Sequence, residues 1–221
     1  MLSARDRPRG LLERPLTTAV VAAGILVTTV IYGYVEFGWP PVLILGGSGL
    51  LAFALSYRTS LRPAQSEIIL PLFLLTFAGF EVHLTEEYVG HYAPAISRLF
   101  NIGWTEQSFV LTSCVLAAVL SLTALGLSYQ KPLAGFVAWL FFVSRLAEVS
   151  LFVFPLLRPA IEPSTVGAIS RHVTSGAFVA DMPNYYYPIA GRYYFAGMYT
   201  VALPVVPALY AIYRLWRWRA A

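Results

Sequence analysis

Residues 66–91 decide how this chain is organised, and they read Ser-Glu-Ile-Ile-Leu-Pro-Leu-Phe-Leu-Leu-Thr-Phe-Ala-Gly-Phe-Glu-Val-His-Leu-Thr-Glu-Glu-Tyr-Val-Gly-His. The stretch begins as an apolar segment that is long enough to cross a bilayer. Its last third carries five ionisable residues, namely Glu81, His83, Glu86, Glu87 and His91. Ionisable groups at membrane depth are costly, so their presence here indicates a functional site.

Helical geometry predicts which of these side chains share a face. Each residue of an α-helix advances by about 100°. His83 therefore lies between Glu86 and Glu87, whereas Glu81 points to the other side of the helix. We expect one imidazole and two carboxylates to converge on one spot. The alternative interpretation is a helix end at the membrane interface whose polar residues simply meet water.

The composition indicates an integral membrane protein. Of the 221 residues, 58% are hydrophobic and only 12% are charged, and the mean hydropathy is +0.67. Soluble domains are nearer to a quarter charged. The net charge of +4 does not indicate a nucleic-acid partner, because the basic residues lie at segment ends and form no stripe with interleaved aromatics.

Six apolar segments predict an all-α, polytopic membrane bundle. A hydrocarbon core about 30 Å thick needs about 20 helical residues, and lipid cannot satisfy an open strand edge, so the spans must be helices. We expect residues 1–14 to form a cytoplasmic tail and residues 15–221 to form a single transmembrane domain. The predicted spans are approximately 15–38, 41–57, 66–91, 107–128, 133–156 and 193–213.

The distribution of basic residues predicts the orientation of the chain. With six spans, ten of the 15 Lys and Arg residues fall on the side of the termini and four on the other side. Cytoplasmic loops carry the excess of Lys and Arg. We therefore expect a multi-pass protein of the cell membrane with both termini in the cytoplasm, and the His83 end of its span on the outer side.

The fifth span supplies two further candidate residues. Arg145 and Glu148 lie near its centre, and Glu148 falls at a depth from which it can share a pocket with His83. Their i, i+3 spacing also fits simple mutual neutralisation on one helix. We predict a catalytic centre of His83, Glu86, Glu87 and Glu148, with Arg145 steadying an anionic group.

The same residues allow two kinds of chemistry. One imidazole with several carboxylates can hold a divalent Zn, Mn or Fe ion, and the predicted ligands are His83, Glu86 and Glu87, with His172 from the loop 157–191 as a further candidate. Such an ion would activate water or polarise a carbonyl. Without a metal, the carboxylates can act as a general acid and base.

Two motifs resemble a known family. The run from His83 to Tyr88, His-Leu-Thr-Glu-Glu-Tyr, is similar to the signature of the HXXEE family of small bacterial integral membrane proteins. That family's last span opens with Tyr-x-Pro-Gly-x-x-Thr and continues to Leu-Pro. Residues 194–204 match this pattern except that Ala196 replaces the proline. The family's middle Asn and His are absent, and the fifth span has Arg145 and Glu148 instead. The resemblance covers roughly residues 66–215 and implies a polytopic fold, but no activity.

These observations favour a membrane-embedded enzyme that acts on a lipophilic small molecule near the outer leaflet, with membrane lipids as its surroundings. A proton- or ion-coupled carrier is an alternative, since carboxylates within spans also form relays. Many carriers have repeated halves, and this sequence has no convincing internal repeat. A non-catalytic accessory subunit is a third possibility, and it predicts that the polar residues face a partner chain.

Overall fold

The computed structural model describes residues 15–37, 42–59, 65–93, 104–157 and 196–217, and these residues form helices and turns without strands. The prediction of an all-α bundle of about six helices is confirmed. The helices are α1 (Pro15–Phe37), α3 (Gly47–Thr59), α4 (Gln65–Val89), α6 (Glu106–Ser128), α7 (Pro132–Leu157) and α9 (Ala202–Arg217), and the short π-helical segment η2 (Val42–Gly46) precedes α3.

Four of these helices are long and apolar enough to cross a membrane, through the segments Thr17–Val35, Glu67–Val89, Glu106–Ser128 and Pro132–Val149. The protein is therefore membrane-embedded. The outward face of α6 fits this setting, because it exposes Leu111, Val115, Leu122 and Leu125. Helices α3 and α9, with 13 and 16 residues, are shorter than a typical span.

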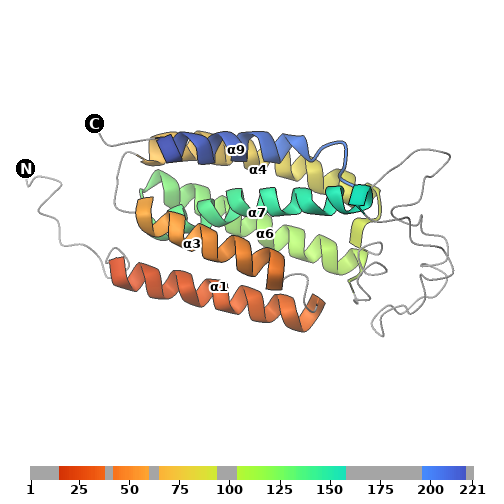
Figure 1. Cartoon of the computed structure of the whole chain (residues 1–221), viewed down its shortest axis with the longest axis horizontal. Coiled ribbons are helices and arrows are strands. Elements are labelled where there is room, and N and C mark those ends of the chain that lie inside the picture. The colour runs from red at the N-terminus through yellow and green to blue at the C-terminus, as the bar shows by residue number, and fades with distance from the viewer. Residues whose placement is uncertain (1–14, 38–41, 60–64, 94–103, 158–195, 218–221) are drawn as a thin grey trace, which may run out of the picture.

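The helices run alternately in opposite directions along one bundle axis (Figure 1). Helix α4 packs extensively against α9, α3 packs against α7, and α1 lies at the edge of the bundle. The start of α1 and the end of α9 lie at the same end of the bundle, as an even number of crossings requires. This arrangement brings the ends of α4 and α7 that carry the candidate site residues to the opposite end from the start of α1.

An aromatic core holds α4 and α7 together. Phe73 of α4 is fully buried and packs edge-on against Phe141 of α7, with ring centroids 5.5 Å apart. Seven residues further along α4, about two turns closer to the candidate site, Phe80 contacts the same Phe141 ring at 5.4 Å. Such edge-to-face pairs add to the energy of burial. The core thereby fixes the register of α4 against α7.

The connection between α6 and α7 is a tight turn. Gln130 adopts a positive φ of 55°, and the Lys131 backbone N–H donates to the carbonyl of Gly126 at 2.9 Å. This pattern satisfies the last carbonyls of α6. Pro132 then starts α7, a position where a missing N–H costs nothing. The two helices are consequently antiparallel neighbours.

The last helix begins later than the sequence predicted. The predicted span started at residue 193, but residues 196–201 form turns and α9 starts at Ala202. Gly197 has a positive φ of 91°, which is incompatible with a continuous right-handed helix. Pro204 cannot donate to Thr200, and the Leu203 N–H donates to the Thr200 carbonyl at 2.9 Å instead. Gly197 and Pro204 therefore both favour a turn before α9.

A glycine allows α4 and the start of α9 to approach closely. A Cβ atom on Gly79 would lie 2.6 Å from the backbone carbon and oxygen of Leu203. No real side chain tolerates such a contact, so this approach requires glycine. The turn at residues 196–201 is thereby held over the last third of α4, where His83 lies.

Candidate functional site

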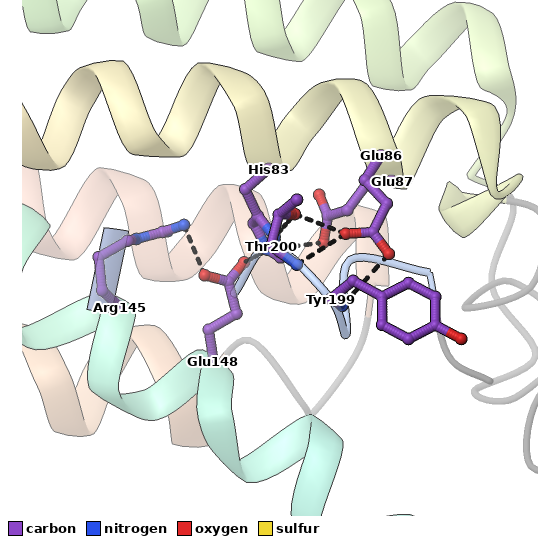
Figure 2. Close-up of polar contacts among 7 residues, drawn as sticks. All are labelled: His83, Glu86, Glu87, Arg145, Glu148, Tyr199 and Thr200. Atoms are coloured by element: carbon purple, nitrogen blue, oxygen red, sulfur yellow. Dashed lines mark hydrogen bonds and ion pairs between the residues drawn. The ribbon is translucent and has the colours of Figure 1, made fainter. Parts of the chain in front are cut away.

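The candidate site lies where the last third of α4 meets α7 and the turn before α9 (Figure 2). The His83 side chain is completely buried, and its Nε2 atom lies 3.5 Å from Oε1 of Glu87 and 3.7 Å from Oε1 of Glu148. The possible ligand atoms of these three residues all lie within 4.8 Å of one another. One imidazole and two carboxylates therefore share a single interior spot.

Helical spacing and depth explain this convergence. His83 and Glu87 are four residues apart on α4, so their side chains lie one above the other. Glu148 reaches the same spot from α7. The predicted meeting of His83, Glu87 and Glu148 is present, but the prediction that Glu86 joins them as a ligand is wrong, because its oxygens bind the turn before α9. Glu81 is exposed, as predicted.

Arg145 and Glu148 form an ion pair on α7. Nη1 of Arg145 donates to Oε2 of Glu148 at 2.6 Å, and the two side chains are only 11% and 14% exposed. The guanidinium carbon also lies 4.0 Å from the centroid of the Phe80 ring, which favours a cation. The pairing expected from the i, i+3 spacing is therefore present. A role for Arg145 towards a substrate stays a prediction.

Glu86 does not join the group of three and is bound to the turn before α9. Its Oε2 accepts hydrogen bonds from the Thr200 backbone N–H at 2.8 Å and from the Thr200 hydroxyl at 2.6 Å. Its Oε1 accepts from the Tyr199 backbone N–H at 3.3 Å. These N–H groups lie just before the first residue of α9, where a negative charge is favourable. Glu86 thus anchors this turn to α4.

The Thr200 hydroxyl determines which nitrogen of His83 carries hydrogen. Nδ1 of His83 lies 3.1 Å from this hydroxyl oxygen. A hydroxyl has one hydrogen to donate, and here Glu86 accepts it. The Thr200 oxygen must therefore accept from Nδ1–H. In the neutral imidazole, Nε2 then presents its lone pair to Glu87 and Glu148.

Gly197 closes the site from the side of α9. A Cβ atom at this position would lie 2.5 Å from Cε1 of His83 and 3.0 Å from Cγ of Glu87. The positive φ of Gly197 independently favours glycine. The backbone of the turn can thus lie directly against the imidazole ring.

The remaining predicted residues have different positions. His91 follows the end of α4, with a φ of 57°, and pairs with Glu106 at the start of α6. Both side chains are substantially exposed, so this pair is separate from the buried group. His172 lies outside the described residues, as do Asp181 and the tyrosines at 185–187.

Two residues of the site were not predicted as such. Thr200 and Gly197 belong to the Tyr-x-x-Gly-x-x-Thr pattern of the last span. This pattern indicates that the two residues belong to a motif, but it does not predict that they contact His83. In the structure, the two motifs that carry the family resemblance touch each other.

No family model matches the chain, and no match is found among curated proteins or among solved structures. The resemblance to the HXXEE family therefore stays a prediction. An imidazole nitrogen beside two carboxylates can bind a cation or transfer protons.

Proposed function

We propose that this protein is a membrane-embedded enzyme in which His83, Glu87 and Glu148 act on a lipophilic small molecule. The observation that carries the proposal is the complete burial of His83 between two carboxylates from different helices. Burying these groups costs stability. A structural role needs no such centre, because the aromatic core already joins α4 to α7.

The groups present can perform metal-assisted chemistry or general acid–base catalysis. A buried carboxylate such as Glu87 can take a proton from water or from a substrate, and His83 can pass a proton on. Arg145, which holds Glu148 at 2.6 Å, adds a positive charge that stabilises a developing anion. Arg145 and Glu148 are 11% and 14% exposed, so the centre is not completely sealed on their side.

The setting favours a lipophilic substrate. His83, Glu87 and Glu148 belong to segments that are long and apolar enough to lie in the membrane, and a lipid or similarly apolar metabolite can reach them from the bilayer. We place the protein in the cell membrane with both termini in the cytoplasm, since basic residues are concentrated on that side. The site then faces the outer leaflet.

Lipid profiling tests the enzymatic proposal. Purified protein in vesicles of total lipid extract from the cells that express it is compared with Glu87→Gln and Glu148→Gln by mass spectrometry of the lipids. We expect a substrate–product change that both substitutions abolish and that the exposed control Glu81→Gln retains. Identical lipid profiles for the native protein and Glu87→Gln would count against an enzyme acting on these lipids.

A cation carrier is the second candidate, and the two-carboxylate centre is the observation that favours it. Charged side chains inside spans also mark ion pathways. Flux of Mn²⁺ or Zn²⁺ into vesicles that contain the protein, lost in Glu87→Gln, would identify a carrier. An accessory subunit is less well supported, because His83 is enclosed by its own bundle.

A further inference from the structure

We propose that His83 Nε2, Glu87 and Glu148 bind one divalent transition-metal ion, with Thr200 and Glu86 fixing the orientation of the imidazole. This inference deepens the proposed function and rests on the same centre. Four observations carry it: the distances from Nε2 to the two carboxylate oxygens, the identity of the nitrogen that faces the carboxylates, the buried Glu87 oxygen, and the charge of the site.

The distances fit a shared ion better than direct hydrogen bonds. An N–H···O hydrogen bond has a donor–acceptor distance of about 2.7–3.2 Å, whereas Nε2 lies 3.5 and 3.7 Å from the two carboxylate oxygens. Ligand atoms about 2.1 Å from a tetrahedral ion lie about 3.4 Å from one another. The gap between the imidazole and the carboxylates is thus the size of a coordinated ion.

The hydrogen bonds from His83 to Thr200 and from Thr200 to Glu86 leave Nε2 of His83 without a hydrogen and thus able to bind a metal. Nδ1–H donates to Thr200, which in turn donates to Glu86. Metal-binding histidines commonly donate their other ring N–H to a fixed acceptor, which sets the tautomer. The lone pair on Nε2 then points at two carboxylate oxygens, an arrangement that is repulsive unless a cation or a proton lies between them.

Glu87 provides an independent observation. Its side chain is 3% exposed, and its Oε1 is buried and accepts no hydrogen bond from any residue that the structure describes. Buried polar atoms nearly always have partners. This oxygen lies 3.5 Å from Nε2 of His83, so an ion between the two atoms would give the oxygen a partner.

The charges of the site also match a divalent ion. Glu86, Glu87 and Glu148 supply three negative charges when ionised, and Arg145 supplies one positive charge. With a neutral His83, two negative charges remain, and one divalent cation balances them. The second oxygen of Glu148 is held by Arg145, which leaves Oε1 to the ion. Two ligands thus have partners that orient them.

One nitrogen and two oxygen ligands suit Zn²⁺, Mn²⁺ or Fe²⁺. Catalytic zinc sites use three protein ligands and keep a fourth position for water or substrate. The three groups here leave such a position. An ion held this way would lower the pKa of a bound water and supply a nucleophile at neutral pH.

Metal analysis of the full-length protein in detergent tests the inference. Protein purified without chelators, and protein stripped and reloaded separately with Zn²⁺, Mn²⁺ or Fe²⁺, is assayed by plasma mass spectrometry. We expect one equivalent of metal per chain. Glu87→Gln and Glu148→Gln should each lower the affinity by more than about 100-fold, beyond the loss typical of an outer-shell partner. Glu81→Gln and His91→Ala should bind as the native protein does.

The outcomes separate this inference from the proposed function. If the native protein binds none of the three ions, the metal site is wrong, while a lipid conversion that requires Glu87 would still identify an acid–base enzyme. Equal binding in Glu87→Gln and the native protein would also overturn the site. Since Gln keeps the shape of Glu, a monodisperse variant that unfolds cooperatively in excess chelator, at a temperature no lower than that of the native protein, shows that lost binding is not misfolding.

Discussion

Replacing Thr200 with valine tests the link between the two motifs most directly. Valine keeps the shape of threonine but removes the hydroxyl that donates to Glu86 at 2.6 Å and lies 3.1 Å from Nδ1 of His83. The backbone N–H of residue 200 still donates to Glu86 at 2.8 Å, so the turn before α9 should stay in place. The substitution therefore acts chiefly on the orientation of the imidazole.

The structure allows the size of the effect to be worked out. In the variant, Nδ1–H of a completely buried ring loses this acceptor, and a buried donor without a partner costs about 1–3 kcal/mol. Loss of an outer-shell partner typically lowers metal affinity about 10–100-fold, which corresponds to about 1.4–2.7 kcal/mol. We expect Thr200→Val to weaken Zn²⁺ binding within this range and to destabilise the metal-free protein by a similar amount.

Competition with a chromophoric chelator in detergent measures the Zn²⁺ affinity. Thr200→Ser keeps the hydroxyl and should bind within about threefold of the native protein, a change well under 1 kcal/mol. Thr123→Val is the matched control, because the Thr123 hydroxyl donates only to a backbone carbonyl of its own helix, that of Val119, at 2.8 Å. The reasoning is refuted if Thr200→Val binds Zn²⁺ as tightly as the native protein, or if Thr200→Ser loses as much affinity as Thr200→Val.

Three further predictions concern the walls and the charges of the site. Gly197→Ala should abolish Zn²⁺ binding in the chelator assay, because the added Cβ would lie 2.5 Å from the His83 imidazole. Gly135→Ala is the control and should bind normally, because a Cβ added there meets no other atom within 4 Å. Normal binding in both variants would show that the turn does not contact the ring. Arg145→Met should lower the free energy of unfolding by about 3–5 kcal/mol, since it leaves Glu148 buried without its partner. Adding Glu148→Gln should restore much of that loss, and a double variant no more stable than the single one would contradict the pairing. In excess chelator, Glu87→Gln should melt at a higher temperature than the native protein, because it lacks the buried carboxylate. In saturating Zn²⁺ it should melt at a lower temperature, because metal at 100 times its Kd stabilises the native protein by about 2.7 kcal/mol. If the more stable of the two proteins is the same in both conditions, a metal at Glu87 is contradicted.

Much of the fold follows from the sequence. Apolar runs separated by Pro and basic residues located all six helices, and the fifth span, predicted to start at about residue 133, starts at Pro132. The start of α9 was wrong by several residues, because residues 193–201 are as apolar as the helix that follows them. The positive φ of Gly197 determines where that helix begins, and hydropathy carries no information about a backbone angle.

The sequence predicts the part of the candidate site that depends on spacing within one helix, but not the part that depends on how closely two helices approach. The i, i+4 spacing of His83 and Glu87 is local, and the depth of Glu148 in its span could be counted along α7. The contact of Thr200 with His83 depends on how closely α4 approaches α9. That distance is set by the absence of a side chain at Gly79, so no pattern of polar residues could reveal it.

Glu86 and Glu87 are adjacent in sequence but differ in their hydrogen-bond partners. Both oxygens of Glu86 accept hydrogen bonds from N–H and O–H donors of the turn before α9, so Glu86 stabilises the fold whether or not a ligand is bound. Glu87, one residue later, has a buried oxygen that accepts no hydrogen bond from the described residues. A bundle that needed only stability would gain by placing an apolar residue there. A cation between Glu87 and His83, as in the metal site proposed above, would offset that cost.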